Sequence, residues 1–263
     1  MHITPVPCLK DNYAYLITAD GTPGKALVVD PSETEPVVRA LEGSGLELVG
    51  ILNTHHHFDH VGGNEGLVSR YGKLPVYGHA SDQGRIPAQS ERIEHGGEFE
   101  IMGLKFRALH IPGHTLGAIA YIVDDAVFTG DTMFAAGCGR LFEGTPAMMY
   151  ESLNLKLGKL PDATKVYFGH EYTASNLKFA EHVEPGNKAV RDKARRVAEQ
   201  RAHVGERCLI KLPTLRRGTN SAAFLPSGNT RGHKGPCYHP RDACRVSGRF
   251  TRARRRRRNR RSG

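Results

Sequence analysis

Apolar residues occur in short runs separated by polar stretches along residues 1–206 of the chain. Runs rich in β-branched and aromatic residues, such as YAYLITA, are typical of strands. The continuous apolar runs KALVVD and LVGILNT indicate strands that are buried on both faces. Paired runs predict hairpins that turn at Gly103 and at Asp124–Asp125. Altogether the pattern predicts about ten short strands.

Segments with apolar residues at helical spacing lie between these strands. The segment SETEPVVRALEGSG predicts a helix that is capped by Ser32 and ends at Gly43. The same pattern predicts helices in NEGLVSRYG, PAMMYESLNLKLGKL, NLKFAEHV and NKAVRDKARRVAEQRAHV. Paired strands separated by helices indicate a layered α/β protein with mixed sheets, although the pattern leaves the topology open.

Composition adds limits on the class of protein. The hydrophobic fraction of 39% is enough for a sizeable core. No run of about 18 apolar residues is present, so we expect no membrane span. The first residues, MHITPVPCLKDNYAYLI, lack the basic and long apolar segments of a signal peptide. Five cysteines without regular spacing argue against a disulfide framework, and we expect a cytoplasmic protein.

The charge is distributed very unevenly. Residues 1–206 carry −6 and residues 207–263 carry +16, which together give the net +10. The second part is rich in Gly, Pro, Ser and Arg and ends in TRARRRRRNRRSG. Such a composition cannot bury enough apolar surface to offset its ordering entropy, so we predict a disordered basic tail.

The stretch ILNTHHHFDHVGGNE concentrates ionisable groups directly after an apolar run. In an extended segment His55 and His57 point the same way, and Asp59 and His60 come next, at the turn into the following helix. Imidazole and carboxylate suit Zn²⁺, Fe²⁺ or Mn²⁺, whereas a closed structural zinc site would normally include cysteine. The pattern therefore predicts a metal site, and a solvated polar loop is the alternative.

Four groups from one loop are too close together to complete a metal shell. Three further candidates come directly after buried strands elsewhere in the chain: His114, Asp131 and His170. Strand ends on one side of an α/β sheet are where sites collect, so we expect these side chains to meet the His55–His60 loop.

These residues are similar to the ligand pattern of the metallo-β-lactamase fold superfamily. The longer stretches KDNYAYLI, THHHFDHVGGN, FTGDTMFAAGCGRLFEGT and GHEYTASNLKFAEHVEPGN resemble the glyoxalase II family, the hydroxyacylglutathione hydrolases. The resemblance covers roughly residues 1–203. It implies a four-layer αββα sandwich with a C-terminal helical segment.

The resemblance also implies two divalent metal ions, most often zinc, with iron or manganese as alternatives. The first ion would be held by His55, His57 and His114, and the second by Asp59, His60 and His170. Asp131 would bridge them. His56 lies between ligands and is interpreted as structural or as supporting the ligands from behind.

The implied activity is hydrolysis of S-(2-hydroxyacyl)glutathione thioesters, such as S-D-lactoylglutathione, in methylglyoxal detoxification. A metal-bridging hydroxide would attack the thioester, with Asp59 and Asp131 in the catalytic centre. The resemblance places Arg140 and Tyr172 against glutathione, and Phe142 stands where some relatives carry a tyrosine. Weaker substrate-binding candidates lie on the next helix, and these are Asn176 and Lys178.

The domain organisation is implied by the same resemblance. We expect a catalytic domain over residues 1–169, a helical segment over 170–206 that completes the glutathione site, and the tail over 207–263. The family's usual C-terminal sequence is absent after Glu206. The abrupt change in composition leads to the hypothesis that residues from about Arg207 derive from a shifted reading frame.

Two other functions stay open at this point. One is a persulfide dioxygenase with a single iron, against which the full second ligand set argues. The other is a metal-dependent nuclease, because an arginine-rich tail can bind phosphates. The tail lacks the interleaved aromatic residues typical of nucleic-acid binding, which argues against the nuclease. We expect a monomer that acts on a small molecule, a glutathione thioester.

Overall fold

The computed structural model describes residues 1–204 and 210–211. These residues belong to one unit that covers residues 1–226. The predicted basic tail, residues 207–263, lies outside the described part of the chain except for Ile210 and Lys211.

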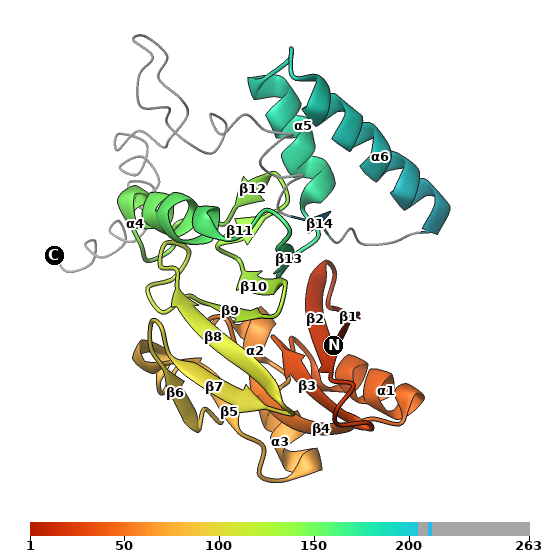
Figure 1. Ribbon diagram of the computed structural model, residues 1–263, viewed down its shortest axis with the longest axis vertical. Coiled ribbons are helices and arrows are strands. Elements are labelled where there is room, and N and C mark those ends of the chain that lie inside the picture. The colour runs from red at the N-terminus through yellow and green to blue at the C-terminus, as the bar shows by residue number, and fades with distance from the viewer. Residues whose placement is uncertain (205–209, 212–263) are drawn as a thin grey trace, which may run out of the picture. The chain divides into compact units, whose positions relative to one another are not determined.

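Two six-stranded sheets form the framework (Figure 1). The first sheet has the strands β1 (His2–Cys8), β2 (Asn12–Thr18), β3 (Lys25–Val29), β4 (Glu47–Leu52), β5 (Val76–His79) and β6 (Glu91–Ile93), in that order. The second sheet has, in spatial order, β14 (Ile210–Lys211), β13 (Lys165–Phe168), β10 (Ala126–Gly130), β9 (Ile119–Val123), β8 (Leu104–His110) and β7 (Glu98–Ile101). Both sheets mix parallel and antiparallel pairs, as the alternation of hairpins and helical connections predicts.

The central strands are buried on both faces, which explains their continuous apolar runs. In β2, Tyr13, Tyr15 and Ile17 point into the core between the two sheets. The residues between them, Ala14 and Leu16, point to the opposite face. This alternation results from the two-residue repeat of a strand.

Helices cover the outer faces of the sheets. Outside the first sheet lie α1 (Thr34–Ser44) and α3 (Asn64–Tyr71), whose apolar side chains pack on β2 and β3. On the second sheet lies a helical stretch of α4 (Pro146–Tyr150), η2 (Glu151–Lys156) and η3 (Leu157–Lys159), which packs through Met149, Leu153 and Leu157. The predicted four-layer αββα arrangement is thus confirmed.

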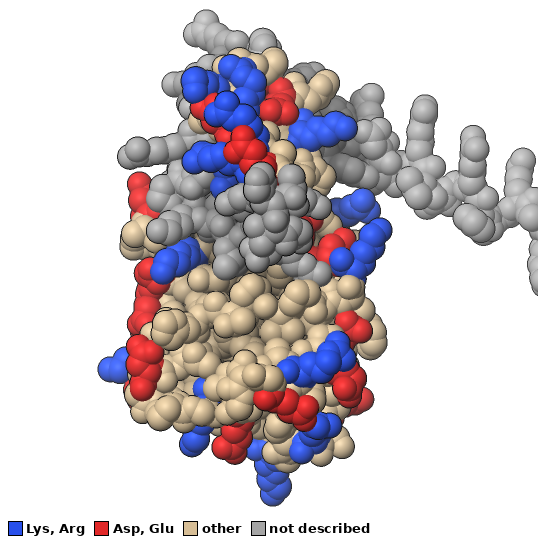
Figure 2. All heavy atoms as spheres, turned by 90° about the vertical axis from the view of Figure 1, so that its right-hand side faces the viewer, with Lys and Arg blue, Asp and Glu red and all other residues tan. Residues whose placement is uncertain are grey.

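Two longer helices come after the last long strand of the second sheet. They are α5 (Thr173–Val183) and α6 (Lys188–Val204), which pack against each other (Figure 1). They form the predicted C-terminal helical segment. Acidic and basic side chains are interspersed on the face of the molecule shown in Figure 2.

The ends of α1 differ from the prediction. Its N-cap is Glu33 rather than Ser32, and the Glu33 side chain makes no capping hydrogen bond. The helix continues past Gly43 to a C-cap at Gly45, whose φ of 63° lies in the left-handed region that favours glycine. Of the two glycines near this end, only Gly45 is in the conformation that ends a helix.

Some short elements were not predicted at all. The sequence pattern missed β5 and β6, the small hairpin of β11 (Met133–Phe134) and β12 (Gly137–Cys138), the turn η1 (Ala80–Asp82), and α2 (Phe58–Val61). These elements have two to four residues, which is too short for a recognisable period.

At two residues the structure also differs from the predicted tail. Ile210 and Lys211 form β14, which pairs antiparallel with Lys165 and Val166 at the edge of the second sheet. An unpaired sheet edge offers free backbone groups to any nearby strand, and composition does not reveal this. In the described part of the chain, no helix is both long and apolar enough to cross a membrane.

Candidate metal centre

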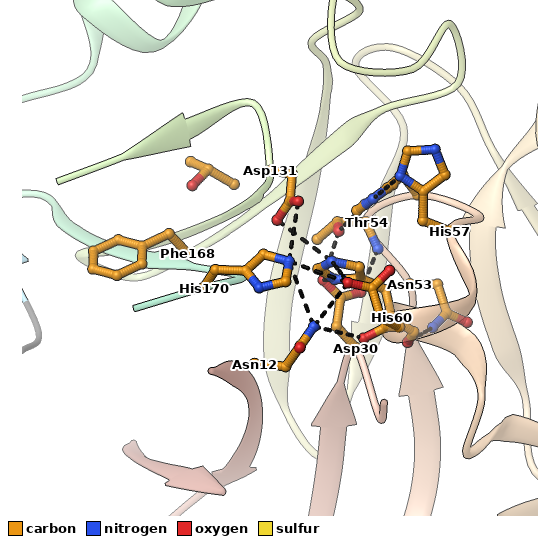
Figure 3. A network of polar contacts seen from close by, with 12 residues as sticks. Asn12, Asp30, Asn53, Thr54, His57, His60, Asp131, Phe168 and His170 are labelled. Atoms are coloured by element: carbon orange, nitrogen blue, oxygen red, sulfur yellow. Dashed lines mark hydrogen bonds and ion pairs between the residues drawn. The ribbon is translucent and has the colours of Figure 1, made fainter. Parts of the chain in front are cut away.

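The candidate ligands lie on segments that come after four strands of the two sheets. The His55–His60 loop lies after β4, and the segments after β8, β10 and β13 carry His114, Asp131 and His170. In Figure 3 the side chains of His60, Asp131 and His170 point toward one another from different elements. The structure therefore brings together all seven residues that the sequence analysis selects as ligands.

Asp30 fixes the start of the ligand loop. Its carboxylate accepts hydrogen bonds from the backbone N–H of Thr54 at 2.7 Å and from the Thr54 hydroxyl at 2.6 Å. Asp30 is buried and has a φ of 48°, which is uncommon for a residue other than glycine. Such backbone strain collects at functional sites, where the surrounding structure holds the residue in place.

Three imidazoles form a first group. The Nδ1 atom of His57 lies 3.2 Å from Nε2 of His55 and 3.0 Å from Nε2 of His114. The rings of His55 and His114 are buried, and His57 is half-buried. Three nitrogen atoms that converge in this way form a ready set of ligands for a cation.

A second group joins two imidazoles and a carboxylate. The Oδ2 atom of Asp59 lies 3.2 Å from Nε2 of His170 and 3.8 Å from Nε2 of His60. The short helix α2 presents both Asp59 and His60 from the ligand loop. Asn12 donates hydrogen bonds from Nδ2 to the backbone oxygen of Asp59 at 2.9 Å and to its Oδ2 at 3.1 Å (Figure 3).

Asp131 lies between the two groups. Its Oδ2 atom is 3.6 Å from Nε2 of His114 in the first group and 3.2 Å from Nε2 of His170 in the second. Its Oδ1 atom is 3.4 Å from Nε2 of His60. One carboxylate therefore reaches nitrogen atoms of both groups.

The ring nitrogens that face away from the centre have their own partners. His60 Nδ1 lies 3.1 Å from Asp30, and His170 Nδ1 lies 3.0 Å from Asp11. His114 Nδ1 donates to the backbone oxygen of Arg140 at 2.8 Å. Such contacts fix the ring orientation and leave Nε2 aimed at the centre.

The sequence analysis assigned no role to three of these supporting residues. Asp11 and Asn12 lie in the KDNYAYLI stretch, which supported the resemblance only as a motif. Asp30 ends the apolar run KALVVD, so it has the same polar-after-strand context that selected Asp131 and His170. This position directly after a strand is the sequence feature by which Asp30 could have been selected.

Two glycines allow the segments around the carboxylates and imidazoles to pack closely, because a glycine has no Cβ atom. A Cβ atom at Gly169 would lie 2.2 Å from Oδ1 of Asp131 and 2.5 Å from Cε1 of His60. A Cβ atom at Gly130, whose φ is 50°, would lie 2.2 Å from the Thr54 hydroxyl oxygen. Both distances are far below van der Waals contact, so a side chain at either position would displace the centre.

The first group is electrostatically suited to bind a cation. Burial and the neighbouring imidazoles lower the pKa of His57 to about 4 and that of His55 well below its usual value. Burial also lowers the pKa of His114. The three rings are therefore neutral at pH 7, which is the form that binds a metal.

The second group carries negative charge close to its imidazoles. Although burial acts to lower it, hydrogen bonds to Asp131 and Asp59 raise the pKa of His170 to about 10. Burial also acts to lower the pKa of His60, but the charge and hydrogen bond of Asp131 outweigh it and raise that pKa. The pKa of Asp59 is lowered by its hydrogen bond to His170. The carboxylates thus favour a positive charge in the second group.

Buried polar atoms test whether a metal fits. His60 Nε2 and Asp131 Oδ1 are both buried and lie 3.4 Å apart, and neither has another hydrogen-bond partner among the described residues. Asp30 also lies near His55 and His60, but its oxygens already accept from Thr54 and lie against the rear nitrogen of His60. The open donors, imidazole and carboxylate, are those of a divalent metal site.

The proposed substrate-binding residues lie in three different places. Phe142 is 64% exposed, and its ring meets His57 and His114 edge-on at centroid distances of 5.4 and 5.3 Å. Tyr172 stacks on His170 at 4.9 Å. The Arg140 side chain is exposed, and its backbone oxygen accepts from His114 Nδ1.

The two residues on α5 lie differently from these three. Asn176 donates from Nδ2 to the backbone oxygen of Ala135 at 3.0 Å, so its side chain is turned toward the β11–β12 hairpin. Lys178 is exposed on the same helix. The described structure therefore associates Asn176 with the support of this hairpin.

Comparison with known proteins identifies the family to which this chain belongs. The model of the metallo-beta-lactamase superfamily matches residues 10–170, and the model of the hydroxyacylglutathione hydrolase C-terminus matches residues 171–212. A hydroxyacylglutathione hydrolase of a Synechococcus species is 45% identical over 228 residues, with 84% of this chain and 87% of the relative covered. The chain belongs to the hydroxyacylglutathione hydrolase family. A hydrolase of the same name from Alkalilimnicola ehrlichii is also 45% identical, with 88% of this chain and 90% of that relative covered.

Solved structures share the fold. ETHE1 from Myxococcus xanthus has a TM-score of 0.60 and 28% identity, with 84% of this chain and 98% of that chain covered. TTHA1623 in a di-iron-bound form has a TM-score of 0.54 and 32% identity, with 64% of this chain and 91% of that chain covered. The resemblance inferred from the sequence is thus confirmed, and the histidine and aspartate groups of this family member form a divalent metal site.

Proposed function

We propose that this chain hydrolyses S-(2-hydroxyacyl)glutathione thioesters, with S-D-lactoylglutathione as the representative substrate. The hydroxyacylglutathione hydrolases at 45% identity support this substrate class. The observation that carries the proposal is the position of Asp131, whose carboxylate reaches His114 on one side and both His60 and His170 on the other.

That position favours a centre for two metal ions. We propose that His55, His57 and His114 hold one ion, that Asp59, His60 and His170 hold the other, and that Asp131 is shared. The buried atoms His60 Nε2 and Asp131 Oδ1 support this assignment, since they have no hydrogen-bond partner among the described residues apart from each other. The di-iron form of the relative TTHA1623 supports it as well. Zinc is the first candidate, and iron and manganese accept the same ligands.

The chemistry of such ions suits a thioester. Divalent ions bound here would act as Lewis acids that activate water and polarise a carbonyl oxygen. The protein contributes rigid ligands whose rear nitrogens are held by Asp30, Asp11 and the backbone of Arg140. Because the thiolate is a good leaving group, no general acid from the protein is required.

The surroundings of the centre suit glutathione. Arg140 offers a cation to a carboxylate of the tripeptide, and the Tyr172 hydroxyl offers a hydrogen bond. Phe142 presents an apolar ring beside the imidazoles of the first group, without the hydroxyl of a tyrosine. We propose that the catalytic part, residues 1–169, and the helical segment, residues 170–206, both line the substrate site, in a monomer that acts in the cytoplasm.

Two measurements test the proposal together. Purified full-length protein is reconstituted with zinc, its metal content is determined by mass spectrometry, and the loss of S-D-lactoylglutathione is monitored. We expect two ions per chain and thioester turnover that stops when a chelator removes them. One iron per chain with oxygen uptake on glutathione persulfide would instead favour the dioxygenase. Cleavage of RNA without thioester turnover would favour the nuclease.

A further inference from the structure

A cluster of polar side chains contacts the ligand loop through His56, a residue that is not among the candidate ligands. It consists of His56, Asp82, Arg85 and Glu143, which come from three separate segments of the chain. His56 sits between two candidate ligands but contacts this cluster instead, since its Nδ1 atom is 3.2 Å from Oδ2 of Asp82. The proposed chemistry uses none of these four groups.

Asp82 anchors the cluster inside the protein. Its side chain is 1% exposed, and neither of its carboxylate oxygens has a hydrogen-bond partner among the described residues. The guanidinium of Arg85 lies near it, with the Nη1 atom 3.7 Å from Oδ1. A Cβ atom at Gly117 would lie 2.3 Å from the same oxygen, so the segment after His114 packs directly on Asp82.

Arg85 connects this buried anchor to the segment that carries the substrate-binding candidates. Its Nη2 atom contacts both Nε2 of His56 and Oε1 of Glu143, each at 2.5 Å. The other oxygen of Glu143 accepts from the backbone N–H of Leu116 at 2.8 Å. This ion pair lowers the pKa of Glu143 to about 2, so the carboxylate is ionised at neutral pH.

The segment Arg140–Gly144 depends on such contacts for its position. Its backbone is tied to the His114 turn, with Phe142 N–H donating to His114 O at 3.1 Å and Gly144 N–H donating to Gly113 O at 3.2 Å. Glu143 adds a side-chain contact to the ligand loop through Arg85 and His56. Arg140 and Phe142 lie on this segment and both contact His114, so their placement beside this imidazole depends on the placement of Glu143.

We propose that Arg85 is a positioning residue that locks the Arg140–Gly144 segment to the ligand loop and thereby sets the affinity for the glutathione part of the substrate. This inference rests on the proposed function. Arg85 faces two carboxylates, Asp82 and Glu143, which compensate its charge. It therefore acts on substrate through Glu143 rather than by contact.

The test uses the zinc-loaded full chain and the variant Arg85→Ala. We expect the KM for S-D-lactoylglutathione to rise about tenfold, which is below the roughly 100-fold that a displacement of 1 Å can cost at a reacting centre. The Kd for glutathione, measured by calorimetry, should rise by a similar factor. The kcat should stay within about twofold and the zinc content at its original value, because no ligand of the centre is altered.

Conservative and paired variants distinguish a loss of the Arg85–Glu143 contact from a general loss of structure. Arg85→Lys should restore KM in part, since a lysine offers one point charge where the guanidinium contacts two partners with one nitrogen. Glu143→Gln should raise KM in the same direction. Combining it with Arg85→Ala should add little further to KM, because both changes disrupt the same Arg85–Glu143 ion pair. If Arg85→Ala fails to fold, Glu143→Gln and Arg85→Lys still decide the question.

The matched control is Arg70→Ala. Arg70 pairs with Glu42 at the same distance of 2.5 Å, but it connects α3 to α1 and is about half exposed. This variant should leave KM unchanged. A normal KM in Arg85→Ala, with active wild-type protein, would overturn the positioning role, as would a loss of zinc with a collapse of kcat. If the wild-type chain itself shows no thioester turnover, the proposed function fails and this inference fails with it.

Discussion

At the scale of single residues, Asp131 and Asp30 have opposite tasks. Asp131 faces the centre with both oxygens, near nitrogen atoms of His60, His114 and His170. Asp30 lies behind the ligand loop and accepts from Thr54 while it holds the rear nitrogen of His60. The two carboxylates are both buried, so only their contacts distinguish a ligand from a support.

Replacing Asp131 tests its place between the groups. Asp131→Ala should reduce the zinc content from two ions to one or none and lower kcat/KM by at least about 100-fold, since even supporting residues of a metal site cost 10–100-fold. Metal analysis and the thioester assay measure both effects. The control is Asp125→Ala, which removes an exposed aspartate at the turn before β10 that pairs with Lys165 on the neighbouring strand β13. A variant that keeps two ions and normal turnover would remove Asp131 from the centre.

Replacing Asp30 tests the support of His60. Asp30→Asn keeps the shape but removes the charge and one acceptor, so the ring of His60 is held less firmly. We expect the affinity for the second zinc ion to fall by about 10–100-fold while the first ion is retained. Competition with a chelating dye reports the two affinities. Asp20→Asn is the control, since Asp20 is 75% exposed beside the N-terminal amine. Equal affinities in wild type and Asp30→Asn would contradict this role.

At the scale of elements, the centre depends on the segments that come directly after the strands. The ends of β4, β8, β10 and β13 deliver the ligands, and α2 presents Asp59 and His60 within a single turn. Glycines at these junctions let the segments approach one another. The close approach at Gly169 matters most, because a Cβ atom there would meet both Asp131 and His60.

Adding a methyl group at this junction should disturb the centre. Gly169→Ala should lower the zinc content and cost about 1–3 kcal/mol of stability, as expected for overpacking. The control, Gly43→Ala, places a methyl group on α1 where nothing lies within 4 Å. That change should stabilise the protein by about 0.5–1 kcal/mol, because alanine favours the helix. Thermal unfolding with metal analysis compares the two; full zinc binding by Gly169→Ala would refute the crowding argument.

At the scale of the whole molecule, charge separates two parts of the chain. Residues 1–206 are acidic overall, and Figure 2 shows both signs interspersed on the drawn face. The basic charge is concentrated in residues 207–263. Any attraction to a polyanion would therefore be expected of the second part, whereas all the candidate metal ligands lie in the first.

Removing residues 227–263 separates these properties. Most of the basic side chains of the tail are lost, so retention on immobilised heparin should fall to a much lower salt concentration. The truncated and full-length proteins should hydrolyse S-D-lactoylglutathione with kcat/KM values within about twofold, because every proposed ligand lies before residue 171. Loss of turnover on truncation would show that the tail contributes to catalysis. Resequencing the gene around codon 207 tests the reading-frame hypothesis.

The sequence by itself determined a layered α/β class and seven candidate ligands of this protein. Apolar runs of strand length, helical spacing between them and polar groups directly after buried strands are local patterns that indicate this class and these candidates, whereas the four-layer αββα arrangement was implied by the resemblance to the metallo-β-lactamase fold superfamily. Asp59 and His60 could be selected in this way because they lie within the same dense motif as His55 and His57.

Only the tertiary structure decided which atoms face the centre and which hold it from behind. Asp11 and Asp82 have nothing in their local sequence that separates them from exposed aspartates, and the position of Asp30 directly after a strand does not distinguish a support from a ligand. The roles of all three come from partners more than twenty residues away. The same holds for Arg85 and Glu143, which are joined across 58 residues of chain. Hydrogen bonds and ion pairs act over a few ångströms in space, so a pattern along the chain cannot contain them.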